Sequence, residues 1–119
     1  MTKTKKRKIG DIGEDIACKY LRKKDYKILD RNFLKSFGEI DIIAIKDGVI
    51  SFVEVKTRKN DSFKPASLDV DYYKKERIRK TAQAYIMEKD LADFLISFDI
   101  CEVYLERKMI HYIKNAFGE

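Results

Sequence analysis

The stretch from Gly38 to Arg58 constrains the fold most, because it holds two runs of branched apolar residues on either side of Asp47-Gly48. Asp-Gly between two such runs is a strong hairpin signal, since a type I′ turn needs positive φ at both central residues. A two-residue turn would pair Lys46 with Val49 and would set the register of the whole hairpin.

This register places acidic side chains opposite each other on the two strands. Asp41 falls opposite Glu54, and Glu39 falls opposite Lys56. Because side chains alternate between the faces of a strand, all four point to the same side of the sheet. Both faces are otherwise apolar: Ile43, Ile45, Ile50 and Phe52 share the face of the charged residues, and Ile40, Ile42, Val53 and Val55 form the other.

The negative charges of two opposed carboxylates beside an apolar face need a compensating positive charge, because like charges at facing strand positions are destabilising. Mg²⁺ and Mn²⁺ prefer carboxylate oxygens and would supply that compensation. Lys56, one pleat beyond Glu54, could orient a water or meet the charge of a phosphate. A structural alternative is open: Glu39 and Lys56 form a cross-strand ion pair while the two acids reach solvent. A three-residue loop would instead shift the pairing by one residue, so that Asp41 and Glu54 would lie on different faces of the sheet.

Asp41 followed by Glu54-Val55-Lys56 resembles the D…ExK signature of the PD-(D/E)XK nuclease superfamily. The longer strings GEIDIIA and FVEVKTR resemble the YraN-like family of predicted endonucleases, which are related to archaeal Holliday junction resolvases. The likeness extends to Gly13-Glu14, to Phe98-Asp99 and to the closing residues 113–117. It therefore covers nearly the whole chain beyond the basic N-terminus.

The resemblance implies an α/β fold, with a restriction-endonuclease-like mixed sheet flanked by helices. It implies a metal-dependent endonuclease that hydrolyses phosphodiester bonds in DNA, with branched or flap structures as candidate substrates. Asp41, Glu54 and the backbone carbonyl of Val55 would hold Mg²⁺ or Mn²⁺. Lys56 would position the attacking water or stabilise charge on the phosphate, and Glu14, on the first helix, would support the site through water.

The chain departs from the family in its cations and lacks a pattern found in some superfamily members. Leu34 and then Lys35 stand where many members carry an arginine, so Lys35 would supply charge without the fork of a guanidinium. Ser97 stands where an arginine usually precedes the Phe-Asp motif. Gln83 lies in a predicted helix, as in some relatives in the superfamily, but Met87 stands where their tyrosine would be, so Gln83 receives no role.

Apolar spacing and turn residues predict the element order α-β-β-β-α-β-β within a single domain over residues 9–119. We expect residues 1–8 to form a basic flexible arm, residues 34–37 to link two strands, and residues 59–70, with the only proline, to form a loop. The predicted helices are 9–26 and 71–89, and the predicted strands are 26–33, the two arms of the hairpin 38–58, 95–107 and 109–113.

A net charge of +6 favours a polyanionic partner, most simply DNA. The second helix is rich in lysine and arginine, which suits docking to phosphates, although a solvated helix face would look the same. The predicted nucleic-acid contacts are Lys35, Arg58, Lys74, Lys75 and Arg77.

No apolar run is long enough to span a membrane and no signal-peptide pattern is present, so we expect a cytoplasmic protein without a membrane partner. Cys18, Cys101 and His111 lack the spacing of metal ligands and are read as structural. A competing class is a non-catalytic nucleic-acid-binding module with the same fold, and a third is a protein-interaction subunit. The oligomeric state is left open, with a homodimer among the options.

Overall fold

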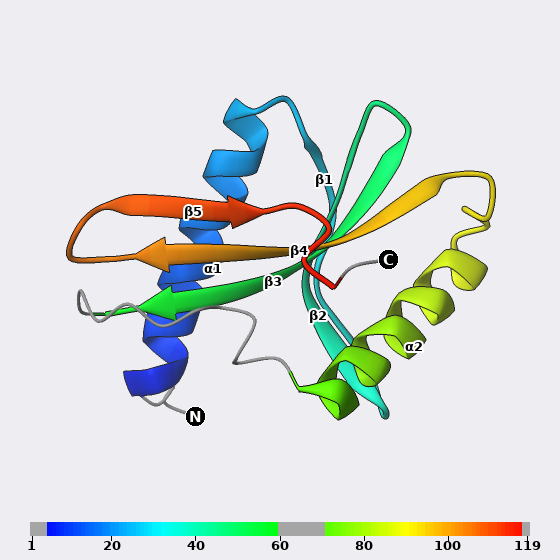
Figure 1. Ribbon diagram of the computed structural model, residues 1–119, viewed down its shortest axis with the longest axis horizontal. Helices are drawn as coiled ribbons and strands as arrows, with labels where there is room; N and C mark the ends of the chain where they lie inside the picture. The colour runs from blue at the N-terminus through cyan, green and yellow to red at the C-terminus, as the bar shows by residue number, and fades with distance from the viewer. Residues whose placement is uncertain (1–4, 60–70, 118–119) are drawn as a thin grey trace.

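A computed structural model of the protein describes residues 5–59 and 71–117. Within them, two helices and five strands follow one another in the predicted order, and the strands form one mixed sheet with helices against it (Figure 1). This confirms the α/β fold class. The elements are α1 (Lys5–Lys23), β1 (Lys27–Lys35), β2 (Gly38–Lys46), β3 (Val49–Arg58), α2 (Tyr72–Glu88), β4 (Leu95–Tyr104) and β5 (Met109–Ile113).

The central hairpin has the predicted turn and register. Asp47 has a φ of 50° and Gly48 a φ of 78°, so both central residues are in the left-handed region that a type I′ turn requires. Lys46 pairs with Val49, and the same register continues to Ile42 opposite Val53. The alternative three-residue loop is therefore excluded.

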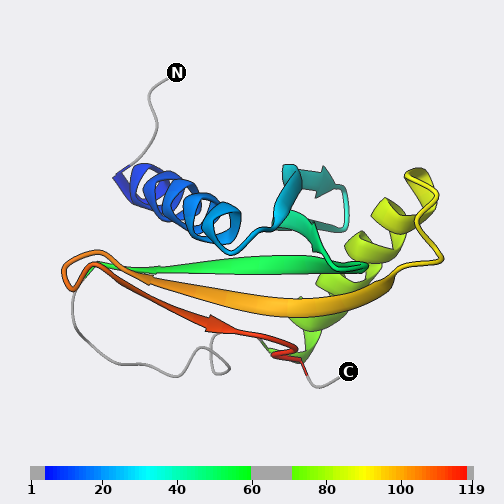
Figure 2. The same cartoon turned by 90° about the horizontal axis from the view of Figure 1, so that it is seen from above.

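The strands lie in their sequence order, β1-β2-β3-β4-β5, and every neighbouring pair is antiparallel except β3 and β4. Parallel neighbours need a crossover connection, and α2 lies in the segment that links them. Figure 2 shows α1 lying along the long strands, while α2 lies beside the end of the sheet where β4 begins.

Alternate residues of the hairpin enter two separate cores, as the apolar character of both faces predicts. Ile43 and Phe52 pack in the cluster that includes α2, whereas Ile42 and Val53 pack in the cluster that includes α1. These two strands are therefore covered on both faces by apolar side chains.

The predicted face is wrong for Ile40, which packs with Ile43 in the α2 cluster rather than with Ile42. The register of β2 with β3 runs only as far as Ile42, whereas its register with β1 continues to Gly38 opposite Lys35. Figure 1 shows the first part of β2 bending away beside α2. The change of face therefore lies between Ile40 and Ile42, and it interrupts the period of two on which the prediction relied.

The two late strings of the resemblance contact each other. The backbone N–H of Asn115 donates to Oδ1 of the buried Asp99 at 2.9 Å, and that of Ala116 donates to the carbonyl of Phe98 at 2.7 Å. The rings of Phe98 and Phe117 stack with their centroids 5.6 Å apart. The Phe-Asp motif therefore anchors the C-terminal segment to β4.

Several element boundaries differ from the predictions. Helix α1 begins at Lys5, so it includes four residues that were assigned to the basic arm, and residues 1–4 lie outside the described residues. The predicted loop 59–70 falls outside them too, apart from Lys59. Strand β4 ends at Tyr104, three residues early. Neither helix in the described part of the chain combines the length and apolar character needed to cross a membrane.

Candidate metal centre and nucleic-acid interface

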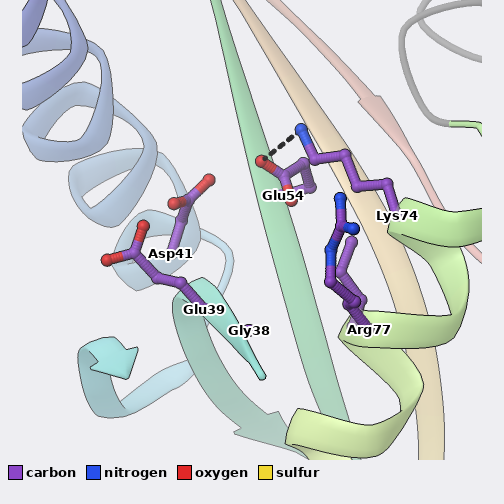
Figure 3. A pocket seen from close by; sticks show the side chains of 7 residues that line it. Gly38, Glu39, Asp41, Glu54, Lys74 and Arg77 are labelled. Carbon is purple, nitrogen blue, oxygen red and sulfur yellow. Dashed lines mark ion pairs between the residues drawn. The ribbon is translucent and has the colours of Figure 1, made fainter. Parts of the chain in front are cut away.

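Asp41 and Glu54 line one cavity of about 170 Å³ at the place where β2 leaves β3 (Figure 3). The structure therefore brings together the two carboxylates that the hairpin register singled out. Helix α2 closes the other side, and Lys74 and Arg77 extend from it toward Glu54 (Figure 3). The remaining lining residues are Gly38, Glu39 and Ile78.

The side chain of Asp41 also bonds to the backbone of β3. The N–H of Val55 donates to Oδ2 of Asp41 at 2.8 Å. In an antiparallel pair, the N–H and C=O of a hydrogen-bonded residue point to the same neighbouring strand. The carbonyl of Val55 therefore points to the edge of β3 at which Asp41 lies. This direction suits the ligand set of Asp41, Glu54 and the Val55 carbonyl.

The pair of carboxylates is electrostatically strained. Burial raises the pKa of Asp41, the negative charge of Glu54 raises it further, and the pKa reaches about 7. The hydrogen bond from Val55 and the charge of Lys74 act in the opposite direction. Asp41 thus tends to hold a proton near neutral pH, and a bound divalent cation would remove this tendency by favouring the ionised form.

Two lysines lie beside this pair. The Nζ of Lys74 lies 3.7 Å from Oε1 of Glu54. Burial lowers the pKa of Lys74, but the carboxylate of Glu54 raises it, and the net shift is upward. Lys56 follows Glu54 by two residues in β3, so strand alternation places it on the same face. It is half-buried and lies close enough to Lys74 to affect the pKa of that residue.

Glu14 approaches the site from the opposite helix. It lies in α1 and is 8% exposed. The preceding Gly13 packs so closely that an added Cβ would lie 1.9 Å from Oγ1 of Thr57 in β3. Burial raises the pKa of Glu14, and the charge of Asp41 raises it further. Glu14 is therefore near enough to Asp41 for their charges to interact, as a supporting role requires.

An arginine that the sequence analysis missed holds Glu14 in place. Nη2 of Arg31 in β1 lies 3.4 Å from Oε1 of Glu14 and 2.9 Å from Oδ1 of Asp15. No local pattern announces this pairing, because it joins a strand to a helix 16 or 17 residues away. Glu39 was also misplaced: it pairs with Leu34 of β1 rather than facing β3, yet it lines the cavity.

The remaining predicted nucleic-acid contacts are in different surroundings. Lys35 forms an ion pair with Glu88 at the far end of α2. Lys75 lies over the ring of Phe117, with 5.7 Å between its Nζ and the ring centroid. Nη2 of Arg58 lies 3.4 Å from Oε2 of Glu102, and both side chains are largely buried. Of the five predicted nucleic-acid contacts, only Lys74 and Arg77 line the cavity.

The donor set fits a hard cation only in part. Among the described residues, no group of three or more histidine, cysteine, aspartate or glutamate side chains is close enough to hold a metal. Two carboxylates do lie together, however, and Mg²⁺ is commonly bound by one or two carboxylates with water and substrate phosphates completing its coordination. Asp41 and Glu54, with the Val55 carbonyl, match that more open type of site.

Comparison with known proteins places the chain in a family. The model of "Uncharacterised protein family UPF0102" matches residues 13–103, which include every residue that lines the cavity, the whole of α2 and the part of α1 from Gly13 onward. A UPF0102 protein from Caldanaerobacter subterraneus is 44% identical over 98% of this chain and all of its own length. A UPF0102 protein from Clostridioides difficile is 44% identical over 91% of this chain and 95% of its own.

The match covers the hairpin, the Gly13-Glu14 pair and the Phe98-Asp99 motif, which carry the resemblance together with the closing residues 113–117, beyond the matched range. The fold agrees with it as well, since the mixed sheet and its flanking helices follow the expected order. The chain therefore belongs to the UPF0102 family, the YraN-like family of the PD-(D/E)XK-like superfamily.

Proposed function

We propose that the protein is a metal-dependent endonuclease that hydrolyses phosphodiester bonds in DNA. The observation that carries the proposal is the crowding of Asp41 and Glu54 in one cavity, where burial and then the charge of Glu54 raise the pKa of Asp41 to about 7. Such crowding destabilises the protein on its own and becomes useful when a cation is bound. Strongly perturbed carboxyl groups in a cleft are typical of functional sites.

In this proposal Asp41, Glu54 and the carbonyl of Val55 hold Mg²⁺ or Mn²⁺. The cation would polarise the scissile phosphate and lower the pKa of a bound water. Glu14 approaches the pair from α1 and would hold a water that completes the site. Arg31 keeps the carboxylate of Glu14 oriented, since the two side chains are 3.4 Å apart.

The cations around the cavity would deal with the phosphate. Lys56, on the face of Glu54, would orient the attacking water or stabilise charge that develops on the phosphate. Lys74 and Arg77 line the same cavity and would neutralise phosphates of the bound strand. The resemblance to Holliday junction resolvases suggests branched or flap DNA as the substrate.

A non-catalytic nucleic-acid-binding module is the second candidate. The observation that favours it is the ion pair between Lys74 and Glu54 at 3.7 Å, because this pair partly neutralises the acidic centre without any metal. In that case Asp41 would stay protonated near neutral pH. The basic surface would then bind DNA and turn nothing over.

Cleavage assays on single-stranded, duplex, flap and four-way DNA, each with and without Mg²⁺ or Mn²⁺, test the proposal. Asp41→Asn and Glu54→Gln should lower metal-dependent cleavage by about a hundredfold or more, comparable to the loss of a key transition-state contact. Lys56→Ala should lose cleavage as well, and Glu14→Gln should lose only part of it. DNA affinity without metal should stay the same or improve in Asp41→Asn, since negative charge near phosphate is removed.

Glu88→Gln provides the matched control, because it also neutralises an acid on the protein but lies with Lys35 at the far end of α2. It should cleave at the rate of the wild-type protein. If no substrate is cleaved by the wild type, and metal does not raise its melting temperature, the binding-module function is the better one.

A further inference from the structure

Two tyrosines at the start of α2 are exposed although the other tyrosines are not. All seven tyrosines of the chain lie in its described part, and five of them are buried or half-buried. Tyr72 is 68% exposed and Tyr73 is 72% exposed. Their rings form an edge-to-face pair with centroids 5.5 Å apart and an angle of 80° between the planes. They form an aromatic surface that is open to solvent.

The aromatic pair adjoins the candidate site. Lys74, the next residue, reaches Glu54 at 3.7 Å. Tyr73 lies four residues before Arg77, which lines the cavity, so both project from the same side of the helix. Four residues of helix rise about 6 Å, a distance of the order of one or two nucleotide steps at 3.4 Å each.

We propose that Tyr72 and Tyr73 form a stacking platform for unpaired bases of a DNA strand whose phosphates lie against Lys74 and Arg77. This inference rests on the proposed function and narrows its substrate class to DNA with unpaired nucleotides beside the site. Aromatic faces next to a positively charged groove are the general means of binding single strands, because every base has a face that can stack. Bases inside a duplex are already stacked and paired, so a duplex cannot use the platform.

The charge around the rings favours nucleic acid over an apolar protein partner. Lys74, Lys75 and Arg77 follow the tyrosines within five residues. Lysine is instead depleted at the centres of protein–protein interfaces. An aromatic pair followed by three cations, with only Glu76 among them, therefore suits a partner that offers flat rings on a negatively charged backbone.

Binding of a labelled thymidine oligonucleotide, measured by fluorescence anisotropy in the presence of EDTA, tests the platform without requiring cleavage. The double variant Tyr72→Ala/Tyr73→Ala should lose roughly tenfold or more in affinity for the single strand, the order expected for the loss of base stacking. Affinity for a duplex of the same length should change by less than about twofold. The double variant Tyr72→Phe/Tyr73→Phe should retain binding, because it keeps both rings.

Met87→Ala is the control, since Met87 is 76% exposed on the last turn of α2, far from the tyrosines. It should leave both affinities unchanged. The chain has no tryptophan, so quenching of tyrosine fluorescence by the oligonucleotide gives a second readout. All variants should melt at the temperature of the wild type, because the altered side chains are exposed.

The outcomes separate this inference from the proposed function. Tyrosine-dependent binding of the single strand supports the platform even if the wild type cleaves nothing, which would contradict only the nuclease. Equal losses for single strand and duplex, or no loss for either, would overturn the platform. A loss of self-association in the alanine variant with unchanged DNA affinity would also overturn it and would assign the rings to contact between copies.

Discussion

At the scale of single residues, Asp41 is the carboxyl group on which the proposed metal site most depends. Its pKa in the folded protein is about 7, raised first by burial and then by Glu54, whereas its ordinary value is 3.8. A carboxyl group with a raised pKa binds its proton more tightly in the folded state. Its favourable effect on stability is therefore complete below about pH 4 and is lost as the pH rises through about 7.

We therefore expect the metal-free protein to become less stable between about pH 4 and pH 7 through this group. The loss amounts to at most about 4 kcal/mol, since one pH unit corresponds to about 1.4 kcal/mol. Asp41→Asn should remove this part of the pH dependence, because an asparagine cannot ionise and its side-chain oxygen can still accept from Val55. Chemical denaturation at a series of pH values in EDTA measures the effect.

Added Mg²⁺ or Mn²⁺ should raise the melting temperature of the wild type more at about pH 8 than at about pH 5, because the cation competes with the proton for the same oxygens. The Asp41→Asn variant should show little of this rise. A metal-induced rise that is equal at both pH values, or equal in both proteins, would contradict a metal centre at Asp41.

At the scale of secondary structure elements, two glycines let the helices approach the hairpin on either side of the site. Gly13 brings α1 against Thr57 of β3. Gly38 brings the start of β2 against α2, where an added Cβ would lie 2.4 Å from Oγ1 of Thr81 and 3.0 Å from the carbonyl of Arg77. These contacts set the distance from Glu14 to the hairpin and the distance from α2 to the cavity.

Gly13→Ala should destabilise the protein by about 1–3 kcal/mol, the usual cost of inserting a methyl group into a packed interior. It should also reduce activity, because a displaced α1 moves Glu14 away from Asp41. Gly10→Ala is the matched control in the same helix, since an added Cβ there meets nothing within 4 Å. That variant should be unchanged or more stable by about 0.5–1 kcal/mol, because alanine favours a helix.

Thermal and urea denaturation of the two glycine variants distinguishes these expectations. The second-site change Thr57→Ala should restore part of the stability of Gly13→Ala, because it removes the hydroxyl that the new methyl group would meet. Equal effects of the substitutions at Gly10 and Gly13 would show that helix propensity, and not the close approach of α1 to β3, determines their stability.

At the scale of the whole molecule, a net charge of +6 predicts that DNA affinity falls steeply with added salt. The logarithm of the affinity should fall with the logarithm of the salt concentration by roughly 0.9 for each duplex phosphate that is neutralised. Arg77→Gln should reduce this slope by about 0.9, because Arg77 lines the cavity. Lys35→Gln should change it less, because Lys35 is already paired with Glu88.

Titrations of labelled duplex DNA at several salt concentrations give these slopes. A variant that keeps its charge, Arg77→Lys, should keep most of the slope and separates the loss of charge from the loss of shape. If Arg77→Gln leaves the slope of the wild type intact, the cavity side of α2 is not the surface that binds phosphates.

Local sequence was sufficient for the hairpin at the centre of the fold. Asp47-Gly48 between two apolar runs predicted the turn, and the turn set the register that brings Asp41 and Glu54 to one cavity. Both signals act over a few residues, through backbone φ at the turn and through the alternation of side chains along a strand. Such local signals also predicted the order of the elements. They did not predict several of the element ends, such as the start of α1 at Lys5 and the end of β4 at Tyr104.

Contacts between distant elements decided the rest of the site. Arg31 pairs with Glu14 and Lys74 pairs with Glu54, and each of these ion pairs joins segments that are far apart in the chain. Ile40, near the start of β2, packs in the cluster that includes residues of α2. These contacts depend on how closely α1 and α2 pack against the sheet, which no periodic pattern within one segment encodes. The turn chemistry therefore positions the two acids, and tertiary packing determines how deeply they are buried and which charges surround them.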